Sequence, residues 1–556
     1  MRAYLIYPEQ RLGDPEANLQ AIEAKLKAVR RDKPELVLFP PGFLLGVGLG
    51  FDSFRPEFTS FFYQEALPRL AKISRKSPPF LLAQPELRDR ETLFYFAEGH
   101  YEKWQAPGIA SIAAEALASA TEYLPLIFSW LPSYLDGPRQ LTRLGRYLTG
   151  DERPCLVLSP AAENSSSDGA FLGEFQYAGV PQRAQGIHEL ELPIASLEQL
   201  ACFTLNRTED LAARQNLDPA RPLMPELSSD LSRALEIPAA GLAQRLQHLG
   251  QTKLILGLSG GMDSTLALVY ARRALMANAQ ALSDLKLYYL PGFGSSEKSL
   301  GNARALATAL DLSLEIIDIR PACEQHFRDI GQPLDRHDIT FENAQARERT
   351  QILMDLANQK GGIVLGTGTL SEAALGWCTF NGDQISMYHV NGGVPKTLVP
   401  ELLKLEAETL RENLGPFATA LEAVAATPAS PELLPAKSGK SVQVDDPLAA
   451  RTEQITEDVL GPYALYDYFL WQFRAKWQTA PQIFAALEAS GLFPELSREQ
   501  QITYLKRFVW RYYGHVFKRR SSADWPSLYA EDLLGVRSER LPSDFNPSFL
   551  LRELEG

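Results

Sequence analysis

A run of small and hydroxyl residues follows an apolar stretch near the middle of the chain. Residues 257–264 read Gly-Leu-Ser-Gly-Gly-Met-Asp-Ser. At a strand-to-helix turn, small residues let backbone amides approach a phosphate, and the helix N-terminus adds its positive end. The hydroxyls of Ser259 and Ser264 add donors, whereas Asp263 would repel phosphate and is better suited to hold a Mg²⁺ that bridges phosphate oxygens. A glycine-rich turn with Asp263 as helix N-cap is the alternative explanation.

The segments around this loop alternate between apolar runs and helical periodicity. Apolar runs predict strands at 254–258, 285–290, 314–319 and 362–366, and the stretches between them predict helices at 264–276, 299–310 and 343–358. Such a series of βαβ units indicates a parallel sheet with helices on both faces. The aromatic segment 461–520 predicts a helical C-terminal part.

The first 200 residues also alternate between strand and helix patterns. Apolar runs at 3–7 and 35–39 predict strands, and Leu19, Ile22, Leu26 and Val29 recur at helical spacing within 15–31. We therefore predict an α/β fold. The expected boundaries are a domain at 1–202, a linker at 203–235 and a second domain at 236–556. A mobile loop at 425–450, rich in Pro, Ala and Ser, is long enough to suggest a lid.

The loop at 257–264 is not the GxxxxGK[ST] phosphate loop, since no lysine follows its glycines. It resembles the pyrophosphate loop of ATP pyrophosphatases, which cleave ATP between its α and β phosphates. Families that make GMP, argininosuccinate, asparagine and thiolated tRNA share this loop. Further motifs follow this loop in the order found in the NAD synthetase family, and they resemble specifically the synthetase domain of the glutamine-dependent type. They occupy 341–350, 358–380, 382–383, 394–397, 461–465 and 517–519.

The resemblance implies a role for each matching residue. Those expected to bind ATP are Gly257, Leu258, Ser259, Gly260, Gly261, Met262, Asp263, Ser264 and Thr367. Those expected to bind deamido-NAD are Asn343, Glu372, Trp377, Cys378, Thr379, Phe380, Asp383 and Lys518. Asp263 and Glu372 would hold Mg²⁺, and Lys396 would act near the ATP phosphates. By residue type alone, Trp377 fits a core position equally well and Lys518 fits a surface charge run.

The implied reaction is a ligation that forms a C–N bond. ATP would convert the nicotinate carboxylate of deamido-NAD to an acyl-adenylate, and ammonia would displace AMP to give NAD. Two other interpretations stay open. One is another ATP-pyrophosphatase amidotransferase with a different substrate. The other is a non-catalytic nucleotide-binding protein, although Asp263, Thr367, Glu372 and Lys396 together favour an enzyme.

The N-terminal part resembles the nitrilase-like domain that supplies ammonia in the glutamine-dependent enzymes through a Glu-Lys-Cys triad. The family has Glu directly after Phe39-Pro40, where this chain has Pro41, which cannot act as a base. Lys103 is a weak match to the lysine, and Phe128 stands where the cysteine is expected. Cys155 fits a core strand better than a nucleophile. We expect a degenerate nitrilase-like domain, so that ammonia is used directly or comes from a separate glutaminase, although retained glutamine dependence is the alternative.

The composition limits the class of protein and its partners. The chain has 556 residues, 45% of them hydrophobic, and a formal net charge of −13. This acidic balance argues against nucleic-acid and anionic-membrane partners. Its four dispersed cysteines favour neither a disulfide framework nor a zinc site. No signal pattern or membrane-length apolar run is found, so we expect a cytoplasmic protein, and the resemblance implies a homodimer or larger homo-oligomer.

Overall fold

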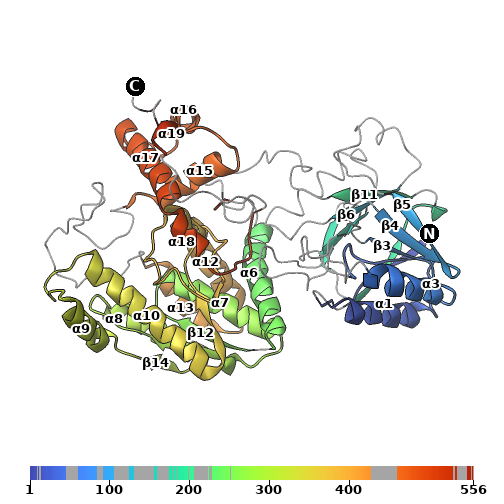
Figure 1. Cartoon of the computed structure of the whole chain (residues 1–556), viewed down its shortest axis with the longest axis horizontal. Coiled ribbons are helices and arrows are strands. Elements are labelled where there is room, and N and C mark those ends of the chain that lie inside the picture. The colour runs from blue at the N-terminus through green and yellow to red at the C-terminus, as the bar shows by residue number, and fades with distance from the viewer. Residues whose placement is uncertain are drawn as a thin grey trace. The chain divides into compact units, whose positions relative to one another are not determined.

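The computed structural model divides the chain into two compact units, Met1–Arg214 and Gln215–Gly556 (Figure 1). The described residues are 1–8, 10–11, 14–44, 60–83, 92–105, 124–129, 156–158, 174–177, 180–183, 186–197, 200–205, 223, 228–250, 252–427, 460–529, 533–534, 547–551 and 554. Across these ranges, no helix combines the length and the apolar character that a membrane crossing requires.

The described residues of the N-terminal unit form two sheets. The first has the strand order β10-β1-β2-β3-β4-β5, and the second has the order β11-β6-β7-β8-β9. The strands of the first are β1 (Arg2–Tyr7), β2 (Leu36–Leu38), β3 (Phe80–Ala83), β4 (Thr92–Ala97), β5 (His100–Gln105) and β10 (Gly186–Glu191). Those of the second are β6 (Leu124–Ser129), β7 (Leu156–Leu158), β8 (Glu174–Tyr177), β9 (Val180–Arg183) and β11 (Leu200–Leu205).

Helices α1 (Pro15–Val29) and α3 (Leu67–Ser74) belong to the same unit, and a π-helical turn at Phe62–Ala66 precedes α3. The Asp14 carboxylate caps α1 by accepting a hydrogen bond from the Ala17 amide at 3.1 Å. The apolar face predicted for α1 is confirmed, because Leu19 and its three partners at helical spacing are all buried.

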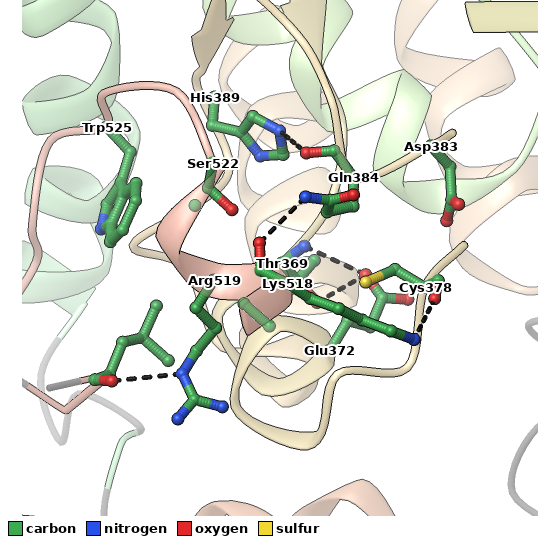
Figure 2. A pocket seen from close by; sticks show the side chains of 14 residues that line it. Thr369, Glu372, Cys378, Asp383, Gln384, His389, Lys518, Arg519, Ser522 and Trp525 are labelled. Atoms are coloured by element: carbon green, nitrogen blue, oxygen red, sulfur yellow. Dashed lines mark hydrogen bonds between the residues drawn. The ribbon is translucent and has the colours of Figure 1, made fainter. Parts of the chain in front are cut away.

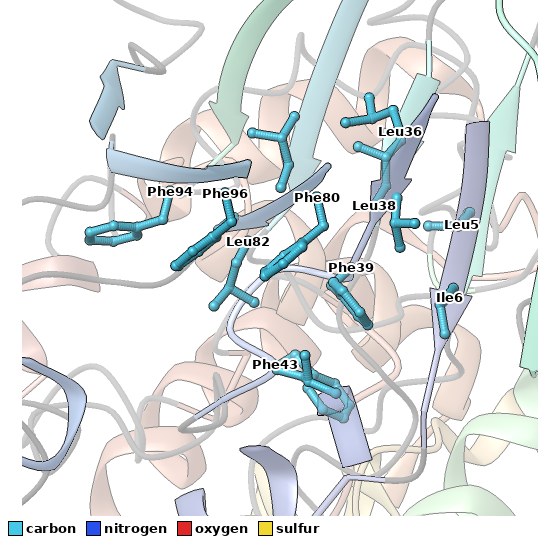
Figure 3. Packing of buried hydrophobic residues seen from close by; sticks show 14 of the residues in the cluster. Leu5, Ile6, Leu36, Leu38, Phe39, Phe43, Phe80, Leu82, Phe94 and Phe96 are labelled. Carbon is cyan, nitrogen blue, oxygen red and sulfur yellow. The ribbon is translucent and has the colours of Figure 1, made fainter. Parts of the chain in front are cut away.

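An aromatic cluster fills the core beneath the first sheet (Figure 3). The rings of Phe80 and Phe96, on neighbouring antiparallel strands, stack with centroids 4.6 Å apart. Phe39 meets the edge of Phe80 at 6.1 Å and lies 6.5 Å from Phe43. All four side chains are fully buried, so the chain that leaves β2 passes into an apolar environment.

The second unit is built on a five-stranded parallel sheet in the order β14-β13-β12-β15-β16. Its strands are β12 (Lys253–Gly257), β13 (Leu285–Tyr289), β14 (Leu314–Ile316), β15 (Gly362–Gly366) and β16 (Tyr388–His389). The chain adds β13 and β14 on one side of β12, and then crosses to add β15 on the other. The sheet therefore has a switch point at the carboxyl ends of β12 and β15, where ligands bind in open α/β sheets.

Helices precede, connect and follow these strands. They are α6 (Ser228–His248), α7 (Met262–Ala277), α8 (Glu297–Ala309), α9 (Arg320–Ile330), α10 (Ile339–Lys360), α11 (Leu370–Leu375), α12 (Val399–Leu410) and α13 (Gly415–Ala425). The helical C-terminal part consists of α15 (Tyr463–Arg474), α16 (Ala480–Ser490), α17 (Arg498–Gly514), α18 (Val516–Arg520) and α19 (Ser548–Leu551) (Figure 1).

The predicted elements differ from the observed ones mainly at their ends. The strand predicted at 314–319 ends at Ile316, because Pro321 follows and helix α9 begins at Arg320. The predicted linker overlaps β11 at its start and α6 at its end. The predicted loop 425–450 begins at the last residue of α13, and its residues 428–450 lie outside the described part of the chain.

Candidate active site

The loop at 257–264 joins β12 to α7 at the switch point of the sheet. Gly260 has φ +80°, and a Cβ placed there would lie 2.1 Å from the carbonyl oxygen of Ser299, so only glycine fits. Gly261 is the N-cap of α7, and its carbonyl accepts a hydrogen bond from the Thr265 hydroxyl at 2.8 Å. The alternative role of Asp263 as N-cap is therefore wrong, and its carboxylate is available for other contacts.

Lys396 joins the two carboxylates that were predicted to hold a metal. Its Nζ lies 2.5 Å from Asp263 Oδ2 and 2.9 Å from Glu372 Oε1. The lysine is almost fully buried, and the side chains of Asp263 and Glu372 are 29% and 19% exposed. Three residues that are far apart in sequence thus form one charge cluster, with two negative groups and one positive group.

Thr369 also holds the Glu372 carboxylate, through its amide and its hydroxyl. Glu372 is the third residue of α11, and its Oε2 accepts hydrogen bonds from the amide and the hydroxyl of Thr369 at 3.0 and 2.9 Å. This capping box directs the other carboxylate oxygen toward Lys396. Burial acts against the charged form of Glu372, but Lys396 and Thr369 outweigh it and lower the pKa of this carboxyl.

Burial has the opposite net effect on Asp263. It raises the pKa of this carboxyl to about 6, with Lys396 opposing the shift and Glu372 adding to it. Burial also disfavours the charged form of Lys396, but the two carboxylates prevail and raise the pKa of the lysine. The cluster therefore keeps its ammonium, and Asp263 is the member that gains or loses a proton near neutral pH.

Asp263 also has an oxygen that fits a metal. Its Oδ1 is buried and has no hydrogen-bond partner among the described residues. Buried polar atoms are normally paired, and carboxylate oxygens are the ligands that Mg²⁺ prefers. Asn391 supports this region by donating to the carbonyl oxygens of Asp263 and Thr367 at 2.9 and 3.0 Å. It thereby joins the first turn of α7 to the turn after β15.

A pocket next to this cluster contains several of the residues predicted to bind the dinucleotide (Figure 2). Its space, including the part open to solvent, is about 500 Å³. Glu372, Cys378, Asp383 and Lys518 line it, as do Gly368, Thr369, Ala373, Gln384, His389, Gly392, Arg519, Ser522, Trp525 and Leu534. The loop after α11 and helix α18, which are more than 130 residues apart in sequence, therefore both line this pocket.

Lys518 on α18 is hydrogen-bonded to backbone carbonyl oxygens of the loop that follows α11. Its Nζ donates to the carbonyl oxygens of Gly376 and Cys378 at 2.9 and 2.6 Å. Burial lowers the pKa of Lys518, and it raises the pKa of the Cys378 thiol to about 12. Burial likewise raises the pKa of Asp383 to about 6, although the Thr379 amide, which donates to this carboxylate at 2.7 Å, opposes the shift.

The other residues predicted to bind the dinucleotide, Asn343, Trp377, Thr379 and Phe380, are not among those that line this pocket. Thr379 donates through its hydroxyl to Asn343 Oδ1 at 2.7 Å, which connects the loop after α11 to α10. Phe380 is partly exposed and packs on Phe517 with centroids 5.2 Å apart. The guanidinium of Arg511 lies 5.0 Å from the ring centroid of Trp377, so Trp377 is a half-buried contact of α17 rather than a fully buried core residue.

Several pocket residues were not predicted. The Gln384 side chain donates through Nε2 to the backbone carbonyl of Lys518 at 2.9 Å. The backbone carbonyl oxygen of Gln384 lies 2.9 Å from His389 Nε2. Burial lowers the pKa of His389 to about 4, so the imidazole is neutral at physiological pH. The position of Gln384 directly after Asp383 is a signal that could have identified it. For Trp525 and His389, no local pattern pointed to the pocket.

The structure also places the residues expected at the nitrilase-like triad. Pro41 is buried, within the segment that carries Phe39 and Phe43 into the aromatic core. Lys103 is exposed on the edge strand β5, with its ammonium 5.5 Å from the ring centroid of Tyr63. Phe128 lies in strand β6, and Cys155 lies outside the described residues.

Comparisons with known proteins identify the family of the central region. Residues 235–415 match the family model of NAD synthase. The glutamine-dependent NAD(+) synthetase of Mycobacterium leprae is 36% identical over 362 residues, which cover 61% of this chain and 50% of that protein. The enzyme of the same name from Mycobacterium tuberculosis is 35% identical with the same coverage. This chain thus spans about half the length of the curated relatives that it matches.

Solved structures with a similar fold match this chain. The glutamine-dependent NAD(+) synthetase from Cytophaga hutchinsonii matches with a TM-score of 0.71 and 15% identity, covering 100% of both chains. The corresponding enzyme from Acinetobacter baumannii, solved with ADP, matches with a TM-score of 0.60 and 17% identity, covering 98% of both. The predicted α/β fold class is confirmed. The region that matches the NAD synthase family, residues 235–415, contains the loop and the charge cluster.

Proposed function

We propose that this protein amidates deamido-NAD to NAD in an ATP-dependent ligase reaction that releases AMP and pyrophosphate. The proposal rests on one observation: Lys396 contacts both Asp263 and Glu372 beside the glycine-rich N-terminus of α7. Loops of this kind bind phosphates. The relatives that match this chain are named NAD(+) synthetases, which favours deamido-NAD over the substrates of other ATP pyrophosphatases.

In the first half of the reaction, a substrate carboxylate oxygen attacks the α-phosphorus of ATP, and the bond from that phosphorus to the bridging oxygen breaks. The backbone amides at the start of α7 would bind the phosphates, and Lys396 would balance the negative charge that builds on the leaving pyrophosphate. Asp263 and Glu372 would hold Mg²⁺, which neutralises phosphate oxygens when it is bound. The contribution of the chain is alignment of the carboxylate with the α-phosphorus.

In the second half, ammonia attacks the acyl carbon, AMP leaves and one proton is released. No protein nucleophile is required, and Cys378 is unsuited to be one, because a thiol with a pKa of about 12 is protonated at physiological pH. The pocket walls would exclude water from the adenylate. Asp383, with its pKa raised to about 6, is a candidate to contact a substrate ribose.

We further propose that ammonia is taken up directly or from a separate glutaminase. A proline stands at the position of the expected general base and is buried beside an aromatic cluster. The lysine expected in the triad is exposed on an edge strand. Retained glutamine use is the second candidate, because the matched relatives carry the words glutamine-dependent in their names.

Steady-state AMP formation with ammonium or glutamine as nitrogen donor tests both parts. We expect turnover with ammonium and, with glutamine, no more than the ammonia that contaminates it supports. Asp263→Ala and Glu372→Ala should abolish AMP formation, whereas Asp318→Ala, which removes an exposed carboxylate paired with Arg320, should not. Full activity of Asp263→Ala would refute the site assignment. Glutamine-driven turnover that Lys103→Met removes would refute the loss of the glutaminase.

A further inference from the structure

A buried aspartate from the helical C-terminal part contacts the two segments that carry Glu372 and Lys396. Asp467 lies on α15 and is only 2% exposed. Its Oδ1 accepts a hydrogen bond from the Ser371 hydroxyl at 2.6 Å, and its Oδ2 accepts one from the Thr397 hydroxyl at 2.7 Å. Each of these hydroxyl residues is the immediate chain neighbour of one member of the charge cluster.

The two segments are also bonded to each other. The Ser371 hydroxyl oxygen accepts a hydrogen bond from the Lys396 amide at 2.8 Å. The Leu370 amide donates to the Val394 carbonyl at 2.9 Å. The Ser371 hydroxyl thus accepts a hydrogen bond from the Lys396 amide and donates one to Asp467, so that one hydroxyl connects α15 to the backbone of the lysine.

We propose that Asp467 is a positioning residue for the adenylation step, a role that rests on the proposed function. It fixes the backbone at Ser371 and Thr397, so that the lysine ammonium and the Glu372 carboxylate keep the separation of 2.9 Å seen here. A carboxylate suits this task, because its two oxygens accept from the two hydroxyls at the same time. Asparagine replaces one of these oxygens by an amide nitrogen, which donates and cannot accept, so one of the two hydroxyls loses its acceptor.

The kinetic test compares Asp467→Asn with Glu406→Gln. Glu406 is an equally buried carboxylate in the same unit, bonded to Arg273 at 3.0 Å and outside the pocket. With ATP, deamido-NAD and ammonium, Asp467→Asn should lower kcat at least tenfold and change the KM values less than threefold. Glu406→Gln should lose a comparable amount of thermal stability and keep kcat within twofold. Asp467→Glu should recover part of the lost kcat, since it retains a carboxylate.

A double-mutant cycle tests whether Asp467 acts through the hydroxyl. Ser371→Ala should lower kcat about as much as Asp467→Asn, and the double variant should lose no more than the worse single variant, because both changes break one chain of contacts. A kcat for Asp467→Asn within twofold of the wild type would overturn the proposal. So would a double variant whose losses in kcat multiply.

Hydrogen exchange decides the same question without turnover. Asp467→Asn should speed amide exchange in peptides that cover 370–372 and 394–397, whereas Glu406→Gln should leave these peptides unchanged. If the wild-type chain forms no AMP, the proposed function fails. In that case the role in adenylation fails with it, whereas faster exchange in these two peptides still shows that Asp467 holds the two segments, and unchanged exchange overturns that part as well.

Discussion

Lys396→Met is the sharpest test of the charge cluster, because it removes the cation and keeps most of the volume of the side chain. In the native protein, the lysine ammonium lies 2.5 Å from Asp263 Oδ2 and 2.9 Å from Glu372 Oε1, and it is 8% exposed. Removing one partner of a buried ion pair costs about 3–5 kcal/mol, because a charge is left buried and unpaired. We expect a loss of this order in the free energy of unfolding at pH 8.

The loss should depend on pH in a defined direction. The folded pKa of Asp263 is about 6, above the ordinary value for aspartate, so this group contributes stability at low pH that is lost as pH rises through 6. Without the lysine this pKa rises further, because Lys396 is the group that opposes the shift. Below this higher pKa, the Asp263 carboxyl binds a proton, which removes the negative charge that the lysine ammonium balances in the wild type. One pKa unit corresponds to about 1.4 kcal/mol, so the deficit of the variant should widen by about 1–3 kcal/mol between pH 6 and pH 8.

Urea unfolding followed by tryptophan fluorescence, in EDTA and without nucleotide, measures this difference. Lys404→Met is the matched control. Lys404 is 59% exposed and pairs with Glu401 at 3.4 Å. Its loss should cost less than about 1 kcal/mol at either pH, as for exposed ion pairs in general. A deficit for Lys396→Met below 1 kcal/mol at pH 8, or one that is the same at pH 6 and pH 8, would refute the electrostatic account of the cluster.

Three further predictions concern the loop, the pocket and the N-terminal core. Gly260→Ala should abolish ATP binding measured by calorimetry, because its Cβ would meet the Ser299 carbonyl at 2.1 Å, whereas Gly301→Ala on α8, with open space around it, should bind normally. Cys378 should react with iodoacetamide at pH 8 about a thousandfold more slowly than free cysteine, since its pKa is raised to about 12; rapid labelling in peptide maps would contradict this. Phe80→Ala should lower the free energy of unfolding by about 3–5 kcal/mol in urea titrations, and a loss under 1 kcal/mol would count against the stacked core.

The sequence predicted four of the five strands that the structure describes in the second unit, because their signals are local. The apolar run at 362–366 coincides with strand β15, and the pattern at 343–358 lies inside helix α10. The glycine-rich loop was placed correctly between a strand and a helix. The strand at 314–319 was predicted too long, since periodicity does not reveal that the start of a helix takes over its last residues.

What the sequence determined by itself was the chemistry available: small residues and hydroxyls at 257–264, and the carboxylates and the lysine in later motifs. Only the tertiary structure decided that Lys396 contacts both carboxylates, that Asp467 holds the segments beside them, and that Trp525 reaches the pocket. The physical reason is that spacing along the chain fixes only which face of a helix or strand a side chain occupies. Its contacts with other elements depend on how elements pack that can lie more than 90 residues apart in sequence, as Ser371 and Asp467 do. That packing is determined by the hydrophobic core as a whole.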